Sequence, residues 1–349
     1  MKKEETRHQT LYRQYRPSTF DEVRGQGAVV NTLKAAIKHK KIAHAYLFSG
    51  GRGTGKTTVA RILAREIDVS DKDLYEMDAA SNRGIDDIRE LREGVYAMPF
   101  ESPYKFYIID EAHMLTKEAW NALLKTLEEP PAHCIFVLAT TEMHKVPDTI
   151  QSRCEVYTFK QPTREVLAQI VVDVAKSEGF TIDKPAAELV ALLAEGSFRD
   201  ALSVLQKVLS VSTSKKIDVS AVEVISGAPK GEIVREIIRG LASKDASVAL
   251  AAIQRAVADN MDARTLTKIL IERMRIILLL RYAPDMREVL EGELSEADLA
   301  LAKSIIKDPG ITSDTLRALL EAYSIMAYAA VPHMPLELAV IDLCTSREQ

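Results

Sequence analysis

Residues 50–57 read Gly50-Gly51-Arg52-Gly53-Thr54-Gly55-Lys56-Thr57, and this stretch decides the fold. It matches the pattern GxxxxGK[ST], in which glycines let backbone N–H groups point at phosphate oxygens. An apolar run, residues 45–48, comes directly before it, and a segment with helical spacing, residues 56–66, follows. The pattern needs this context of strand, turn and helix. We therefore predict a phosphate-binding loop, with a glycine-rich turn that holds no ligand as the alternative.

Two side chains of this loop predict how it would bind a nucleotide. Lys56 would neutralise the β- and γ-phosphates, and the Thr57 hydroxyl would ligate Mg²⁺. The N-terminus of the following helix adds about half a positive charge. The residues that we expect to bind ATP in this segment are Gly50, Gly51, Gly53, Thr54, Gly55, Lys56, Thr57 and Thr58.

The hydrophobic pattern changes along the chain. Apolar runs at residues 105–109 and 134–139 alternate with helical segments, which is typical of a parallel sheet covered on both faces. Beyond residue 162 the spacing is almost entirely helical, and the clearest segments are 164–178, 185–194, 200–209, 264–281, 312–331 and 335–344. We predict an α/β nucleotide-binding domain over residues 1–162, a small helical domain over 163–228 and an all-α domain over 229–349.

Polar side chains follow two of the predicted strands. Asp110 and Glu111 begin the sequence Asp-Glu-Ala-His after residues 105–109. Asp110 would hold Mg²⁺, and Glu111 would orient and deprotonate the attacking water. An acidic pair can also be a solvated loop, but the phosphate loop favours the catalytic interpretation. Thr140 and Thr141 follow residues 134–139, where a hydroxyl could sense the γ-phosphate or the water, or simply form a turn or cap.

Two arginines are further candidates. Arg153, in Ser-Arg-Cys, could form a local salt bridge or reach the ATP of a neighbouring subunit as an arginine finger. Arg199, in Gly-Ser-Phe-Arg-Asp, stands at a predicted helix start. It could be a solvated charge, or it could report the nucleotide state at a domain interface.

Composition excludes several classes of protein. The 349 residues, 47% hydrophobic and 28% charged, predict two to three folded domains and exclude a miniprotein or a disordered chain. Three cysteines without CxxC spacing indicate a reducing cytoplasm. The longest apolar run covers residues 325–331, which is too short to span a membrane, and residues 1–9 do not resemble a secretory signal. We expect a cytoplasmic protein without membrane contact.

The net charge of −4 hides an uneven distribution. Residues 1–65 contain 14 Lys and Arg against 4 Asp and Glu. This excess predicts a basic face turned toward polyanions, although many of these residues could instead cover solvated helix faces.

With these motifs in this order along the sequence, the chain resembles the gamma/tau family of bacterial DNA polymerase III clamp-loader ATPases, within the AAA+ superfamily. The resemblance extends over nearly the whole chain. Besides the motifs above, it rests on residues 11–17 (LYRQYRP), 20–26 (FDEVRGQ), 44–50 (HAYLFSG), 78–81 (DAAS), 121–131 (NALLKTLEEPP) and 335–339 (PLELA). It implies an AAA+ domain, a helical lid and an all-α collar that mediates oligomerisation.

The resemblance also implies residue roles. Thr141 matches sensor 1, Arg199 matches sensor 2, and Arg153 matches the finger that acts on the adjacent subunit's ATP. Lys56, Thr57, Asp110 and Glu111 keep the roles derived above. The residues that match the family's adenine pocket are Tyr12, Arg16, Pro17 and Val23. Those that match its contacts to the DNA backbone are Asn82, Arg83 and Lys125.

By the same resemblance, the protein is an ATP- and Mg²⁺-dependent motor subunit that opens a sliding clamp and places it on primer-template DNA. Its expected partners are other subunits, of the delta and delta-prime type, bound through the collar and the nucleotide interfaces in a homo- or hetero-oligomer. The alternatives are another AAA+ DNA-processing ATPase, such as an archaeal or eukaryotic small subunit or a recombination factor, and a nucleotide-binding scaffold without turnover. Intact Lys56, Thr57 and Glu111 favour turnover.

Two features depart from the family. Its members usually carry a four-cysteine zinc module before the Asp-Ala-Ala strand, but residues 67–75 bridge that interval without a cysteine, so we expect no zinc. The chain also stops after the predicted collar, and we expect a tau-type extension to be missing or removed.

Overall fold

The computed structural model describes residues 9–345 except residues 83, 213, 292–293 and 309. The chain forms two compact units, each described by itself here. Unit 1 holds the described residues up to Leu167 together with Gly196–Asp200, and unit 2 holds the other described residues. The division of the helical part into two domains near residue 228 stays a prediction.

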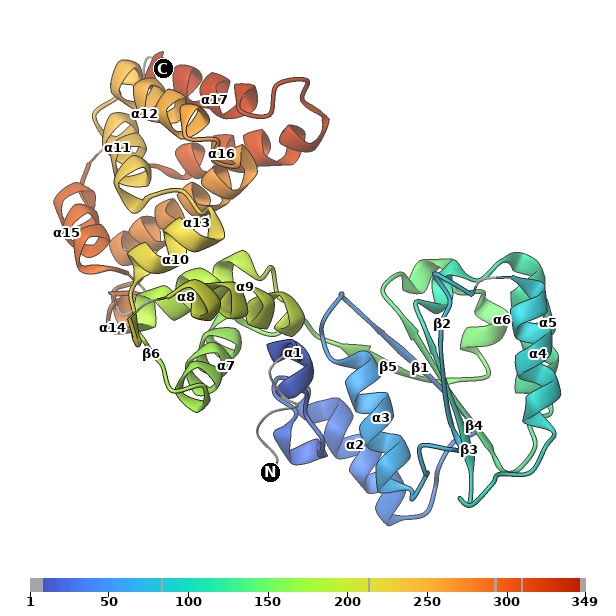
Figure 1. Ribbon diagram of the computed structural model, residues 1–349. Helices are drawn as coiled ribbons and strands as arrows, with labels where there is room; N and C mark the ends of the chain where they lie inside the picture. Colours follow the sequence, from blue (N-terminus) through green and yellow to red (C-terminus); the bar gives the residue numbers. More distant parts are fainter. Residues whose placement is uncertain (1–8, 83, 213, 292–293, 309, 346–349) are drawn as a thin grey trace. The chain divides into compact units, whose positions relative to one another are not determined.

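In the described part of unit 1, five strands form a parallel sheet in the order β2-β3-β4-β1-β5 (Figure 1). The strands are β1 (Ala45–Gly50), β2 (Leu74–Asp78), β3 (Lys105–Asp110), β4 (Cys134–Thr140) and β5 (Glu155–Phe159). Nearly all residues of β1, β3 and β4 are buried, as their continuous apolar runs require. The predicted parallel sheet is therefore confirmed.

Helices cover both faces of this sheet (Figure 1). On one face lie α2 (Gly27–Lys38) and α3 (Lys56–Glu66), and on the other lie α4 (Ile85–Val95), α5 (Lys117–Glu128) and α6 (Asp148–Gln151). Successive strand residues alternate between the two cores, so that Phe48 packs with the α2 and α3 side and Leu47 with the opposite side. The short remaining elements of this unit are α1 (Leu11–Gln14), η2 (Phe20–Glu22), η3 (Ala112–Met114) and η4 (Met143–Lys145).

Unit 2 is predominantly helical, as predicted. Helices α7 (Arg164–Ser177) and α9 (Phe198–Val211) begin in unit 1 and continue into unit 2. The other helical elements are α8 (Lys184–Leu193), α10 (Val219–Ser226), α11 (Gly231–Ala242), α12 (Ala246–Ala258), α13 (Ala263–Tyr282), η5 (Pro284–Met286), α14 (Arg287–Glu291), α15 (Glu296–Ile305), α16 (Ser313–Ile325), η6 (Met326–Tyr328) and α17 (Met334–Thr345). Side-chain oxygens accept backbone N–H groups at several helix starts, where the residues are Asp218, Asp245, Asp262, Ser295 and Thr312.

Four elements differ from the sequence prediction. Strand β5 was not predicted, and its residues are half exposed at the sheet edge. Within the segment predicted to be helical, β6 (Thr181–Ile182) and β7 (Lys216–Ile217) pair in parallel. The helix predicted over residues 312–331 was too long, because α16 ends at Ile325 and the chain is extended at Ala329, shortly before Pro332. Proline cannot continue a helix and disfavours helical geometry in the preceding residue.

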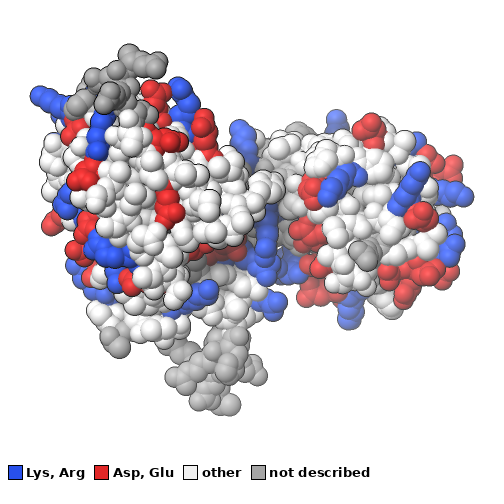
Figure 2. Space-filling model, turned by 90° about the horizontal axis from the view of Figure 1, so that it is seen from above, with Lys and Arg blue, Asp and Glu red and all other residues white. Residues whose placement is uncertain are grey.

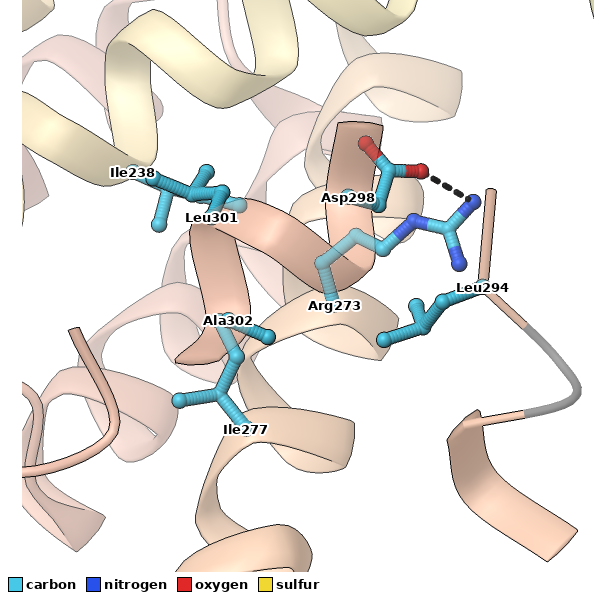
Figure 3. A pocket seen from close by; sticks show the side chains of 7 residues that line it. All are labelled: Ile238, Arg273, Ile277, Leu294, Asp298, Leu301 and Ala302. Atoms are coloured by element: carbon cyan, nitrogen blue, oxygen red, sulfur yellow. Dashed lines mark ion pairs between the residues drawn. The ribbon is translucent and has the colours of Figure 1, made fainter. Parts of the chain in front are cut away.

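A small pocket in unit 2 lies among α11, α13 and α15 (Figure 3). The Arg273 side chain points at Asp298 and its Nη2 lies 3.2 Å from Oδ2, while Arg235 Nη1 lies 3.0 Å from Asp298 Oδ1. The other lining residues are apolar, namely Ile238, Ile277, Leu294, Leu301 and Ala302. No predicted site residue lines this pocket, and its ion pairs join three helices of the same unit.

Charges of both signs are interspersed on the face that Figure 2 shows. Some basic residues of the N-terminal segment are paired with acids: Lys34 Nζ lies 2.5 Å from Asp21 Oδ1, and Arg61 Nη2 lies 2.6 Å from Glu76 Oε2. These pairs agree with the alternative of solvated helix faces for part of the basic excess. Among the described residues, no helix is long and apolar enough to cross a membrane.

Candidate nucleotide-binding site

The motifs predicted to bind and hydrolyse a nucleotide meet at one edge of the unit 1 sheet. Strands β3, β4 and β1 are neighbours and run in parallel, so their carboxyl ends share that edge. The phosphate loop follows β1, Asp110 ends β3, and Thr140 ends β4. Ligands of parallel α/β sheets bind at this edge.

Glycines in the phosphate loop are required by close contacts. A Cβ atom on Gly50 would lie 2.4 Å from the carbonyl oxygen of Phe159. Gly53 has φ +69°, and a Cβ atom there would lie 2.1 Å from Ser197 Oγ. Neither position can take a larger residue without displacement of its neighbours. The loop is therefore packed tightly against β5 and against residues 196–200.

Lys56 begins α3 and is buried. Its Nζ donates hydrogen bonds to the carbonyl oxygens of Gly50, at 2.8 Å, and Gly51, at 2.9 Å. Burial lowers the pKa of Lys56, whereas the nearby carboxylates of Glu111 and Asp110 act to raise it. The ammonium group thus lies inside the loop that would receive the phosphates.

One hydrogen bond links the phosphate loop to the end of β3, and another joins the residues that follow β3 and β4. Thr57 Oγ1 donates to Asp110 Oδ2 at 2.6 Å, and Thr141 Oγ1 donates to Glu111 Oε2 at 3.1 Å. Glu111 has φ +48°, a conformation that non-glycine residues rarely adopt and that is concentrated at functional sites. The predicted magnesium ligands are in direct contact, and so are the predicted base and its sensor.

Residues 196–200 bring Arg199 to the N-terminal segment. The Phe198 N–H donates to the carbonyl oxygen of Gly53 at 3.1 Å, and buried Ser197 packs on that glycine. The Arg199 guanidinium carbon lies 4.8 Å from the centre of the Tyr12 ring, within the range of a cation–π contact. Two residues that were predicted to bind nucleotide from distant parts of the sequence therefore meet in unit 1.

The other predicted adenine-pocket residues lie close to this segment in the sequence. Arg16 and Pro17 follow α1 and are partly buried, and burial lowers the pKa of the Arg16 guanidinium. Val23 follows η2 and packs partly against the core beneath α2 and α3. Thr54 of the loop is fully buried, and Thr58 lies one turn into α3 and is partly buried.

Arg153 lies just after α6, and its side chain bonds to one residue of α5 and one residue of α6. Its Nη2 lies 2.6 Å from Glu128 Oε1, and its Nη1 donates to the carbonyl oxygen of Thr149 at 2.6 Å. The local salt bridge considered from the sequence is thus formed within the chain, and a role toward a second subunit stays a prediction.

The predicted DNA contacts are on the surface of unit 1 as far as the structure describes them. Asn82 is exposed in the turn after β2, where its Nδ2 donates to the carbonyl oxygen of Asp78 at 3.2 Å. Lys125 is exposed on α5. Arg83 lies outside the described residues.

Sequence reasoning missed three residues at this site. Buried Gln26 donates through Nε2 to the carbonyl oxygens of Thr54, at 3.3 Å, and Lys160, at 2.7 Å, and so holds the loop to the end of the sheet. Ser197 packs on Gly53, and His113 lies beside Glu111. Each stands within a motif that was quoted, but only the fold shows what it contacts.

The side chains at this edge of the sheet suit a nucleoside triphosphate and a magnesium ion. A buried lysine, a hydroxyl and a carboxylate converge at the N-terminus of α3, an eleven-residue helix. Backbone N–H groups and a lysine bind phosphate oxygens, and carboxylate and hydroxyl oxygens are ligands that Mg²⁺ takes. The residues therefore fit both groups.

The chain is similar to known DNA polymerase III subunits. The family model described as "DNA polymerase III, delta subunit" matches residues 25–83 and 68–163. The chain is 36% identical to DNA polymerase III subunit tau of Bacillus subtilis over 98% of its own length and 64% of that protein. It is 43% identical to subunit gamma/tau of Mycoplasma genitalium over 62% of its own length and 40% of that protein. For subunit gamma/tau of Mycobacterium tuberculosis H37Rv the identity is 37%, over 79% and 52%. The chain thus spans less than two thirds of each of these relatives.

Among solved structures, the branch migration motor RuvB of Thermotoga maritima matches with a TM-score of 0.52 and 21% identity, over 91% of this chain and 94% of that one. At this identity the match shows the fold alone, an α/β domain with a parallel sheet followed by helices, as the sequence predicted. Sequence identity that extends over almost the entire chain carries the closer assignment. The chain belongs to the gamma/tau family of DNA polymerase III subunits.

Proposed function

We propose that this protein is an ATP-hydrolysing motor subunit of a clamp loader, which opens a sliding clamp and places it on primer-template DNA. One observation carries the proposal: Lys56, the Thr57–Asp110 pair and the Thr141–Glu111 pair converge on the edge of one sheet. Phosphoryl transfer to water needs these parts, namely a cationic cradle, a metal ligand set and a positioned base.

The residues divide the chemistry between them. Mg²⁺, when bound, would neutralise charge on the phosphates, and Thr57 and Asp110 would hold it. Lys56 and the N-terminus of α3 would bind the phosphate oxygens. Glu111 would orient a water molecule and accept its proton, while the Thr141 hydroxyl holds the Glu111 carboxylate. Tyr12, Arg16, Pro17 and Val23 would surround the base, and Arg199 would sense the bound nucleotide.

The expected partners follow from the family. The helical part of unit 2 would form a collar with other subunits of the delta and delta-prime type, in the cytoplasm. Asn82, Arg83 and Lys125 would contact the phosphate backbone of primer-template DNA, which positions the protein without reading its sequence. Arg153 would leave its bond to Glu128 and reach the ATP of the adjacent subunit.

ATP turnover tests the proposal. We expect hydrolysis by the assembled protein, and we expect a sliding clamp together with primed DNA to stimulate it. Turnover that is absent under all of these conditions, in protein that still binds ATP, would favour a nucleotide-binding scaffold and contradict the proposal.

The role of Arg153 between subunits has its own test. Arg153→Ala and Glu111→Gln subunits would each be weak alone, and mixing them should restore part of the activity, since some interfaces then combine an intact base with an intact finger. Failure of every mixing ratio to restore activity, with oligomers formed normally, would count against action on a neighbouring subunit.

A further inference from the structure

His113 closes the Asp-Glu-Ala-His sequence after β3, and the mechanism above gives it no part. It lies in η3, and 7% of its side chain is exposed. Both ring nitrogens have neighbours at the edge of the sheet where the predicted site lies: Glu111 and Thr140 lie beside Nδ1, and Glu142 lies beside Nε2. The two nitrogens of a buried imidazole can each donate or accept a hydrogen bond, and so the ring can orient the side chains beside it.

The contacts of the ring form a chain between the predicted base and the end of β4. His113 Nδ1 lies 3.1 Å from Thr140 Oγ1 and 3.5 Å from Glu111 Oε2. On the other side of the ring, Nε2 lies 3.3 Å from Glu142 Oε1. Thr140 is fully buried, and its Oγ1 also accepts the Glu142 N–H at 3.0 Å.

The partners of the ring decide which nitrogen donates. A hydrogen bond from Lys145, foremost, lowers the pKa of Glu142, whose ionised carboxylate can only accept. The Glu142 carboxylate, 3.3 Å from His113 Nε2, favours a proton on that nitrogen, and in the neutral imidazole Nδ1 is then an acceptor. Thr140 Oγ1 accepts from the Glu142 backbone and has its own proton left for Nδ1. The Glu142 N–H therefore donates to Thr140 Oγ1, and the Thr140 hydroxyl donates to His113 Nδ1.

This arrangement restricts the Glu111 carboxylate. As an acceptor, His113 Nδ1 has no proton to offer Glu111 Oε2 at 3.5 Å, and two acceptors do not attract each other. Thr141 Oγ1 offers Oε2 a proton at 3.1 Å. The imidazole therefore disfavours movement of Glu111 Oε2 toward the ring, and the Thr141 hydroxyl binds the same oxygen.

We propose that His113 is a positioning residue for hydrolysis: Thr140 and Glu142 fix the place of its ring, and the ring in turn keeps the Glu111 carboxylate toward Thr141. The inference rests on the proposed ATPase function and assigns a further residue to that same site. It also gives Glu142, which lies beside His113 Nε2, a supporting role in positioning Glu111.

Steady-state hydrolysis of ATP by the assembled protein tests this role. His113→Ala is expected to lower kcat about tenfold, less than the roughly 10²–10⁴ that a general base contributes, with KM and ATP affinity changed less than about twofold. His113→Asn keeps an acceptor near the Nδ1 position and should recover at least a third of the wild-type kcat. A residue that served only to fill space would not show this split or this rescue.

His144→Ala is the matched control, because His144 Nε2 also lies within 3.6 Å of Glu142 but its side chain is 75% exposed. It should leave kcat unchanged. Wild-type kcat in His113→Ala would overturn the inference, and so would equal losses of kcat and ATP affinity in both the Ala and the Asn variants. If His113→Ala does not fold, Glu142→Ala decides instead: a loss of kcat of about threefold supports the chain, and an unchanged kcat overturns it.

The two proposals fail in different ways. Absence of turnover in the wild-type protein contradicts the proposed function, whatever the His113 variants do. Turnover that Glu111→Gln abolishes and His113→Ala leaves intact supports the function and overturns the positioning role alone.

Discussion

The strand ends of unit 1 and the helices of unit 2 both gather acidic and basic side chains, but their carboxylates have different partners. Asp110 and Glu111 accept hydrogen bonds from threonine hydroxyls, whereas Asp298 pairs with two guanidinium groups. A hydrogen bond to a charged group is worth about 1.5–3 kcal/mol net, whereas removal of one partner from a buried ion pair costs roughly 3–5 kcal/mol. We therefore expect the first region to exchange partners more readily than the second.

The largest effect is expected at Lys56. Lys56→Ala removes the buried ammonium group from the loop, and we predict that it lowers ATP turnover by roughly 10²–10³-fold, the usual loss when one charged or donor group at a transition state is deleted. The melting temperature should change little, because the side chain's bonds go to two loop carbonyls. Lys34→Ala, which removes a lysine from a surface ion pair, is the control. Similar turnover in the two variants would contradict the assignment of the loop.

Asp298 should show the opposite pattern. Asp298→Ala leaves Arg235 and Arg273 without this partner, at side-chain exposures of 22% and 16%, and we predict a loss of roughly 3 kcal/mol of stability in unit 2. The helical signal in circular dichroism should melt earlier, while the fluorescence of Trp120, the single tryptophan and a residue of unit 1, should shift less.

The exposed pair of Asp314 with Arg317 supplies the control for that variant. Its carboxylate is 72% exposed, so Asp314→Ala should cost less than about 1 kcal/mol. If Asp298→Ala were as mild as Asp314→Ala, the distinction between a closed cluster and an exchangeable site would lose its basis.

A smaller effect on stability is expected from the carboxylate of Asp73 in unit 1. This buried carboxylate accepts the backbone N–H groups of Phe100, Glu101 and Ser102 at 2.6, 3.0 and 2.9 Å. Burial acts to raise the pKa of Asp73, but these bonds lower it from 3.8 to about 2. A carboxylate with a depressed pKa stabilises the fold above its unfolded pKa, and this stability is lost as the pH falls from about 4 to about 2.

Unfolding as a function of pH checks this expectation. The difference in unfolding free energy between wild type and Asp73→Asn should be constant above pH 4 and should shrink toward pH 2. A difference that does not depend on pH would mean that the charge on Asp73 contributes nothing to holding residues 100–102.

The sequence predicted the centre of unit 1 well, for a physical reason. Strands β1, β3 and β4 are buried on both faces, so their residues form continuous apolar runs that are visible without a structure. Edge strand β5 reads Glu-Val-Tyr-Thr-Phe and is half exposed, and β6 and β7 have two residues each. Such strands are defined by their neighbours and leave little trace in hydrophobic patterning.

The same limit applies to the site. Lys56, Thr57, Asp110 and Glu111 were predicted because each stands at a fixed place in a short motif. The contact of Arg199 with Tyr12 joins residues that are far apart in the chain, and no local pattern encodes it. His113 was visible in its motif, but its role depends on Thr140 and Glu142, which only the pairing of β3 with β4 brings beside it.

The central claim is that the edge of the unit 1 sheet hydrolyses ATP with Glu111 as the base. Single-turnover hydrolysis by Glu111→Gln, alongside direct measurement of ATP binding, tests it most directly. We expect the amide, which cannot accept the proton of the water, to slow hydrolysis by at least about 10²-fold while ATP affinity is preserved. Hydrolysis at the wild-type rate by Glu111→Gln would contradict it.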